Sequence, residues 1–395
     1  MKILFDLIIK NGLLIDPSQG IHEKKDVAFY QGKVAAIDDD LKSVPGKDAL
    51  HVIDASKRIV TPGIIDLHVH VRSGYRSIKP NCLLISGATT NIDAGTYGAI
   101  NFDNFRYLAQ MSNSRVYAYL NISTIGLTGR PELEILEYGN VEQAVEICKR
   151  NIDLIKGIKV RLTLNALGKS DPMEALDLAK EAAEKVGLPM HVHGIRTNQK
   201  ELLKGIKLRD VLMELRNGDM LTHAYAKYSG IVEEGGQVIP EAKEAIERGV
   251  IFDVGHGSGS FAWKVAEKSL YAGVGPKTIS TDLHASSIMG PCFDMATTMS
   301  KYLFMGCTLD EVVEMATIAP ARAIYMDDMI GTLRLGAKAD ATVFQLEKGR
   351  FDLYDVFGNL RVGNQMLIPR LTVCKGTVYL AGSWREAKWI HPTTP

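Results

Sequence analysis

The stretch Thr61-Pro-Gly-Ile-Ile-Asp-Leu-His-Val-His70 decides the fold, because an apolar run typical of a buried strand ends in two histidines separated by one residue. Side chains at positions i and i+2 leave the same face of a strand, so His68 and His70 are expected to point to one spot. Two imidazoles that converge at a strand end suit a divalent metal such as zinc. An isolated His-x-His fits two unrelated structural histidines equally well, so the interpretation depends on the rest of the chain.

Seven further β-rich apolar runs follow this stretch, with helical segments between them. The eight candidate strands are residues 63–70, 89–94, 116–123, 155–162, 189–193, 220–223, 250–254 and 278–282. Strands that alternate with helices are typical of parallel βα units. Eight such units close into a barrel, so we predict an α/β fold with a (β/α)8 TIM barrel over residues 61–330.

The two ends of the chain have a different pattern, in which short apolar runs are separated by turn residues. Asn11-Gly12 and Gln31-Gly32 lie between alternating apolar residues, and similar runs return after Gly331. Such patterns predict antiparallel hairpins. We therefore predict a small β-sandwich domain that is formed from both termini, residues 1–60 and 331–395.

The composition indicates a protein that acts on a small molecule. Lys+Arg and Asp+Glu are balanced at 46 each, which gives no electrostatic reason to expect nucleic acid or a membrane surface as a partner. The five cysteines are scattered, as in a reducing compartment, and we find no signal peptide or membrane span. We expect a cytoplasmic homo-oligomer with a small-molecule substrate.

The predicted strand ends gather polar residues in a defined order. Catalytic groups in such barrels come from the C-terminal ends of the strands. The candidates, from the first strand to the eighth, are His68 and His70, Lys159, His191 and His193, His223, His256, and Asp282 with His284. Each residue alone is more often structural than functional, but chance explains the ordered set poorly.

With these residues in place, the chain resembles the amidohydrolase superfamily, whose metal-dependent hydrolases combine a (β/α)8 barrel with a small β-sandwich. It looks most like the dihydroorotase and hydantoinase type, and closer still like the deacetylase-like amidohydrolases that include an N-acetyl-(R)-mandelate esterase. The closer match is carried by Asp93-Ala-Gly-Thr, Gly157-Ile-Lys-Val-Arg, Asp219-Met-Leu-Thr-His-Ala, Phe252-Asp-Val-Gly-His-Gly and Ser280-Thr-Asp-Leu-His.

The resemblance implies a site with two divalent metal ions, expected to be zinc. His68, His70 and Asp282 are expected to bind one ion, and His193 and His223 the other. Lys159 is expected to bridge both ions as an N-carboxylated lysine. On the fifth strand His191 remains an alternative to His193; the Gly194 that follows His193 matches the family pattern. In the implied mechanism a metal-bridging hydroxide attacks the substrate, and Asp282 transfers protons.

The residues that bind the substrate are less defined. Arg72 extends the first motif to His-x-His-x-Arg, which helps bind a substrate carboxylate in dihydroorotases, yet an exposed loop charge explains it equally well. Arg161 is a second candidate for an anionic substrate. Tyr97, His256 and His284 are possible polar residues of the pocket.

These observations together predict a binuclear zinc amidohydrolase that cleaves an acyl amide or ester of a small, carboxylate-bearing molecule. The alternative is a cyclic-amide hydrolase of the dihydroorotase or hydantoinase type, which Arg72 favours and the closer motif match opposes. A barrel that has lost its ligands and serves as a non-enzymatic partner is the third hypothesis. It fits poorly, because every expected type of ligand is present.

Overall fold

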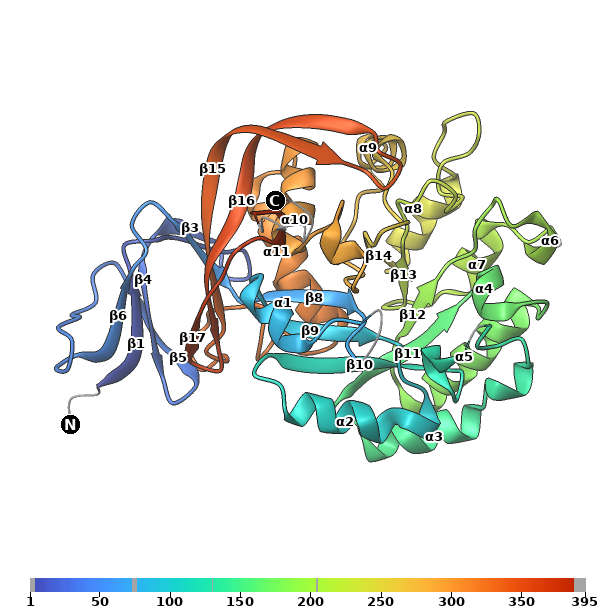
Figure 1. Ribbon diagram of the computed structural model, residues 1–395, viewed down its shortest axis with the longest axis horizontal. Coiled ribbons are helices and arrows are strands. Elements are labelled where there is room, and N and C mark those ends of the chain that lie inside the picture. The colour runs from blue at the N-terminus through green and yellow to red at the C-terminus, as the bar shows by residue number, and fades with distance from the viewer. Residues whose placement is uncertain (1–3, 73–76, 130, 204, 387–395) are drawn as a thin grey trace, which may run out of the picture.

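The computed structural model describes residues 4–72, 77–129, 131–203 and 205–386. Figure 1 shows two parts next to each other: β-sheets that hold the N-terminus, and a larger unit in which helices surround the strands. A hairpin near the C-terminus connects the two parts.

The larger unit contains a parallel sheet of seven strands in sequence order. These strands are β8 (Ile64–Val69), β9 (Ala88–Ala94), β10 (Arg115–Asn121), β11 (Ile155–Arg161), β12 (Met190–His193), β13 (Met220–Thr222) and β14 (Ile251–Phe252). They correspond to the first seven predicted strands. Parallel strands that follow each other in space as they do in sequence bring all their C-terminal ends to one rim.

The eighth predicted strand, residues 278–282, closes the barrel without being a regular strand. Isolated parallel bridges join Thr278 to Asp253 and Leu283 to Val69, so this segment connects the last strand to the first. Its regular pairing is interrupted because Asp282 has a left-handed backbone, with φ of 49°. The predicted barrel is therefore confirmed, with an irregular final strand.

Helices cover the outside of the barrel (Figure 1). They are α1 (Pro80–Ile85), α2 (Phe102–Gln110), α3 (Val141–Arg150), α4 (Leu164–Leu167), α5 (Pro172–Val186), α6 (Lys200–Leu203), α7 (Leu208–Glu214), α8 (Pro240–Glu247), α9 (Trp263–Tyr271), α10 (Met295–Phe304), α11 (Leu309–Ala316) and α12 (Ile318–Ala323). Short 3-10 turns are η1 (Ala99–Asn101), η2 (Gly126–Thr128), η3 (Leu136–Tyr138), η4 (Ser287–Met289) and η5 (Trp384–Glu386).

Helix α5 illustrates how local sequence sets these elements. The Asp171 carboxylate caps its start by accepting from the Met173 amide, and Pro172 occupies the first turn. The helix ends at Gly187, whose φ of 67° is easily adopted only by a residue without a side chain. The buried face, made mostly of alanines, packs against the barrel: Ala175, Leu176, Ala179, Ala182 and Ala183.

The smaller unit consists of two β-sheets that draw on both ends of the chain. One has the order β5 (Lys33–Asp38), β4 (Asp26–Tyr30), β1 (Phe5–Lys10), β6 (Ala49–Asp54). The other has the order β17 (Thr377–Leu380), β16 (Leu360–Cys374), β15 (Ala341–Tyr354), β7 (Ile59–Pro62), β2 (Leu13–Asp16), β3 (Ile21–Lys24). Side chains from both sheets share one buried cluster, which includes Leu7, Phe29, Leu14, Val60 and Val343.

The hairpin of β15 and β16 arches from this smaller unit over the barrel to α9 (Figure 1). At its tip the Trp263 indole donates to the Asn359 carbonyl at 3.1 Å, and Arg361 pairs with Glu267 at 2.8 Å. The Val356 amide also donates to the Phe261 carbonyl. The hairpin therefore holds the loop that follows β14 at the barrel rim.

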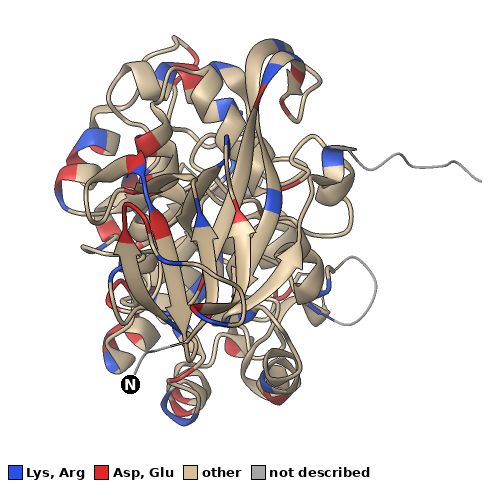
Figure 2. Ribbon diagram, turned by 90° about the vertical axis from the view of Figure 1, so that its left-hand side faces the viewer, with Lys and Arg blue, Asp and Glu red and all other residues tan. Residues whose placement is uncertain are grey.

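Charges of both signs are interspersed over the face of the smaller unit that Figure 2 shows. This distribution agrees with the balanced composition and offers no one-signed surface on that face. In the described ranges, no helix combines the length and the apolar character needed to cross a lipid bilayer.

Candidate active site

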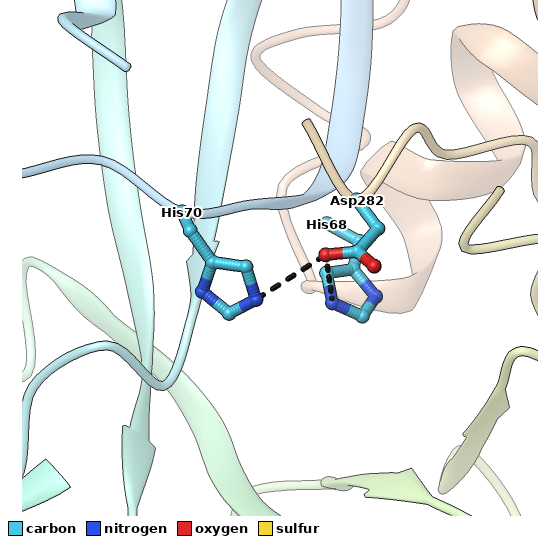
Figure 3. Close-up of side chains that lie close together, drawn as sticks. All are labelled: His68, His70 and Asp282. Carbon is cyan, nitrogen blue, oxygen red and sulfur yellow. Dashed lines mark ion pairs between the residues drawn. The ribbon is translucent and has the colours of Figure 1, made fainter. Parts of the chain in front are cut away.

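The two histidines that end β8 converge on Asp282, as Figure 3 shows. The Asp282 Oδ1 lies 3.4 Å from His68 Nε2 and 3.3 Å from His70 Nε2. His68 is buried and His70 is partly exposed toward the rim. Two imidazoles and a carboxylate within this distance can hold a divalent cation.

Neighbouring groups fix the orientation of the ring of His68. The Thr222 hydroxyl donates its only proton to Asp253 at 2.7 Å, so it must accept from His68 Nδ1, which lies 2.9 Å away. The lone pair of His68 is therefore on Nε2, the atom that faces Asp282. The Nδ1 of His70 is similarly tied to the Thr96 hydroxyl at 2.9 Å.

The Asp253 carboxylate is buried below the site and belongs to a hydroxyl network. It accepts from Thr222, Thr278 and Ser280 at 2.6 to 2.8 Å. Burial raises the pKa of its carboxyl. A second buried carboxylate, Asp66, accepts from the Thr281 hydroxyl and amide, and burial raises its pKa to about 7. These networks anchor the segment that carries Asp282.

Lys159 lies fully buried at the end of β11, and its Nζ is 2.7 Å from His191 Nδ1 on the adjacent strand. No carboxylate in the described part of the chain lies within ion-pair distance of its Nζ. Burial, followed by the charge of Arg161, lowers the pKa of Lys159 to about 7. Its amine is therefore substantially neutral near physiological pH.

His191 and His193 have different surroundings although both end β12. His191 is fully buried, stacks on Tyr119 at 4.4 Å, and leaves its Nε2 without a hydrogen-bond partner in the described structure. His193 is partly exposed and its ring centre lies 4.2 Å from that of His223. His193 therefore faces His223, whereas His191, with His68 and Asp253, offers ligand atoms close enough to hold one cation.

The ring of His223 is also oriented by the backbone. Its Nδ1 is 2.6 Å from the Gly255 carbonyl, which can only accept, so the free lone pair is on Nε2. Burial lowers the pKa of His223 to about 3 and keeps the imidazole neutral. A neutral imidazole is the form that binds a metal ion.

Backbone strain concentrates at two of these residues. His223 and Asp282 have φ values of 60° and 49°, which non-glycine residues rarely adopt. Gly257 approaches Asp282 so closely that an added Cβ would lie 2.4 Å from its Oδ2. Strain of this kind is typical of functional sites, where the surrounding structure holds a side chain in place.

Burial alone would raise the pKa of the Asp282 carboxyl, but the hydrogen bond with His70 holds it below its usual range. The residue is therefore an ionised carboxylate. An ionised group with imidazole neighbours can bind a cation and can also accept a proton.

Arg72 and Tyr97 line a cavity of about 860 Å³ whose described lining contains none of the predicted ligands. Its wall includes Thr96, whose hydroxyl bonds His70, and residues of α1 and α2. Tyr97 is buried, which raises the pKa of its phenol. The structure therefore brings these two predicted substrate residues to the same cavity.

The other three predicted substrate residues have separate environments. Arg161 is buried and forms an ion pair with Glu132 at 3.2 Å. His256 is also fully buried, with its Nδ1 2.8 Å from the Gly257 carbonyl and its Nε2 2.6 Å from Lys301 Nζ. His284 is half-buried near Asp282, and its Nδ1 is 2.9 Å from the Ser286 hydroxyl.

Sequence reasoning missed Arg196, which follows β12. Its Nη2 lies 3.0 Å from the Ser260 hydroxyl and 3.4 Å from His193 Nε2. The signal that could have found it is its position three residues past a predicted ligand. The hydroxyls of Thr96 and Thr222 were also missed, since their role depends on contacts between strands rather than on spacing.

Comparison with known proteins is consistent with this arrangement. The model of the Amidohydrolase family matches residues 59–378. A protein named deacetylase from Enterococcus faecalis is 31% identical over 95% of this chain and 99% of its own length. A deacetylase of Agrobacterium fabrum is 35% identical over 87% of this chain and 83% of its own length.

Several solved structures also match nearly the whole chain. A structure titled as an adenine deaminase superposes with a TM-score of 0.87 and 31% identity, covering 95% of this chain and all of the other. A structure titled as a dihydroorotase superposes with a TM-score of 0.83 and 30% identity, again covering 95% of this chain and all of the other. An L-hydantoinase from Arthrobacter aurescens, at 16% identity, shares the fold with a TM-score of 0.69 over 96% of this chain and 98% of its own.

Proposed function

Because the chain belongs to the amidohydrolase family, we propose that it is a binuclear zinc hydrolase that removes an acyl group from a small, carboxylate-bearing amide or ester. The observation that carries the proposal is the convergence of His68 and His70 Nε2 on Asp282. The relatives named deacetylases, which match most of the chain, support the acyl substrate.

We propose two metal positions, the first of which corresponds to a group of close ligand atoms. His68, His70 and Asp282 would hold one ion, and His193 with His223 the other. The tautomers of His68 and His223 support this assignment, because each leaves Nε2 free to bind. When bound, the two ions would lower the pKa of water and polarise the substrate carbonyl.

Lys159 is proposed to bridge the two positions as a carbamate. It is buried between the two groups of ligands, has no carboxylate partner among the described residues, and bonds His191. An amine must be neutral to react with carbon dioxide, and burial favours that form. The close approach of Gly95, where a Cβ would lie 2.5 Å from Lys159 Cγ, leaves room for the lysine stem.

Asp282 is proposed to move the proton during hydrolysis. It accepts a proton from the attacking water and passes it to the leaving amine or alcohol. The Gly257 backbone behind the carboxylate and the Thr281 contacts to Asp66 keep it oriented. Asp282 is the one aspartate or glutamate of the proposed ligand set, and we therefore assign this role to it.

A cyclic-amide hydrolase of the dihydroorotase type is the second candidate. Arg72 at the cavity favours it, as does the likeness to the structure titled as a dihydroorotase. Curated dihydroorotases are more distant, however; that of Aquifex aeolicus is 25% identical over 87% of this chain and 90% of its own length.

The test is hydrolysis of a compound panel by protein supplied with zinc and bicarbonate. The panel contains N-acyl amino acids, O-acyl hydroxy acids and cyclic ureides. The proposal predicts turnover of an acyl amide or ester, and turnover of cyclic ureides alone would favour the second candidate. Absence of any hydrolysis by protein that contains two zinc ions per chain would contradict both.

A further inference from the structure

Three arginines lie near the rim, and their partners distinguish them. Arg161 is neutralised by the buried Glu132 at 3.2 Å. Arg72 lines the cavity between α1 and α2. Arg196 bonds only neutral groups among the described residues: the Ser260 hydroxyl at 3.0 Å and the His193 ring at 3.4 Å.

The guanidinium of Arg196 is partly buried without a carboxylate within ion-pair distance in the described ranges. An arginine guanidinium keeps its positive charge in proteins. A charge removed from water without an anionic partner is unfavourable unless a ligand supplies one.

Its position fits a ligand at the proposed metal site. Arg196 contacts His193 at the end of β12 and Ser260 in the loop after β14. The same loop places Gly257 against Asp282. Arg196 therefore connects the two strand ends that border the reacting group, and its planar fork of donors matches a carboxylate.

We propose that Arg196 binds the carboxylate of the substrate and thereby selects anionic acyl compounds. This inference rests on the proposed hydrolase function and assigns the anion-binding role to Arg196 rather than to Arg72 or Arg161. Arg196 contacts the unreactive end of the substrate, so it determines specificity and takes no part in proton transfer.

The experiment compares an acid with its neutral analogue. The best N-acyl or O-acyl acid from the panel and its carboxamide are each assayed with the wild type, Arg196→Gln, Arg196→Lys and Arg72→Gln. Arg196→Gln should lower kcat/KM on the acid by about 10²- to 10³-fold, mostly through KM. It should change kcat/KM on the carboxamide by less than about threefold, and Arg196→Lys should recover part of the loss.

Several outcomes would overturn the inference. These are equal losses on the acid and the carboxamide, a selective loss in Arg72→Gln instead, or a wild type that does not prefer the acid. A wild type without this preference would leave the proposed acyl hydrolase function unaffected. Thermal unfolding of each variant checks that the substitution has not disrupted the fold.

A binding measurement decides the point if no compound is cleaved. Zinc-loaded wild type and Arg196→Gln are titrated calorimetrically with an N-acetyl amino acid and its carboxamide. The wild type should bind the acid at least about tenfold more tightly than the variant does. Equal affinity of the two proteins for the acid, or no detectable binding by the wild type, would refute the role of Arg196.

Discussion

The two halves of the proposed metal site are organised differently. At the β8 end, His68 and His70 already converge on Asp282, and threonine hydroxyls hold both rings. At the ends of β11 and β12, Lys159 bonds His191 and Arg196 contacts His193. The first half is therefore assembled by the protein's own hydrogen bonds, whereas in the second half the described structure holds only the His223 ring by such a bond, to the Gly255 carbonyl, and the proposed bridge depends on carboxylation of Lys159.

This difference predicts an order of binding. A preorganised site binds its ion without first rearranging its ligands, so the His68 half should fill first. The second half should fill only when carbon dioxide or bicarbonate is present to modify Lys159. The following substitutions break one half at a time.

The largest effect is expected for Lys159→Ala, which removes the proposed bridge. Activity should fall below detection and the protein should retain about one metal ion instead of two, because the His68 half does not depend on the lysine amine. Acetate, a short carboxylate, should restore part of the activity. Metal analysis and assays with and without acetate measure these effects, and a variant that keeps two ions and full turnover would refute the bridge.

Asp282→Asn tests the half of the site that contains His68, His70 and Asp282. The amide keeps the size of the side chain but cannot accept the proton, so kcat should fall about 10²- to 10⁴-fold while the barrel stays folded. Single-turnover kinetics on the best substrate would measure the chemical step, and thermal unfolding would show whether the fold is intact. Near wild-type turnover would show that Asp282 does not transfer the proton, and His284 would be the next residue to test.

Gly257→Ala tests whether the backbone places Asp282. The new methyl group would lie 2.4 Å from Asp282 Oδ2, and φ of 52° adds strain, so we expect a loss of about 10²-fold in kcat through displacement of the carboxylate. Gly259→Ala in the same loop is the matched control, because nothing lies within 4 Å of its added Cβ. Similar losses in the two variants would contradict the explanation.

Thr222→Val and Thr96→Val should have the smallest effects of the four tests. Each removes a hydroxyl that orients one ring of the His68 half, and such partners typically contribute 10- to 100-fold in metal affinity. Zinc affinity should therefore weaken for the first ion bound, with a smaller change for the second. Competition with a chromophoric chelator measures the affinities for both ions. An unchanged affinity for the first ion would show that the hydroxyls do not organise this half.

The structure brings His68, His70 and Asp282 together, partly because of local rules; their role as metal ligands was implied by the family resemblance and stays a prediction. The i and i+2 spacing places His68 and His70 on one face, and strand order brings Asp282 beside them. The barrel was predicted for the same reason, since strands and helices alternate with clear turn signals. Even the irregular eighth segment closes the barrel at the predicted residues.

The remaining features depend on contacts that spacing does not encode. His256 is fully buried beside Lys301 of α10, and the hairpin of β15 and β16 supplies the Tyr354 carbonyl to the same lysine; a role of His256 in substrate binding stays a prediction. Arg196 contacts Ser260 in the loop after β14, and the Thr222 hydroxyl on β13 contacts His68 on β8. Ser260 and Thr222 lie far along the chain from the residues that they contact, so the one local signal is the position of Arg196 three residues past His193.

The most direct test of the two-half site is a zinc titration of metal-free protein, with bicarbonate present or excluded and bound metal counted after removal of free ions. The account predicts two ions per chain with bicarbonate, one without it, and hydrolytic activity that appears with the second ion. Two ions bound equally well in both conditions, or a single ion with full activity in the presence of bicarbonate, would contradict it.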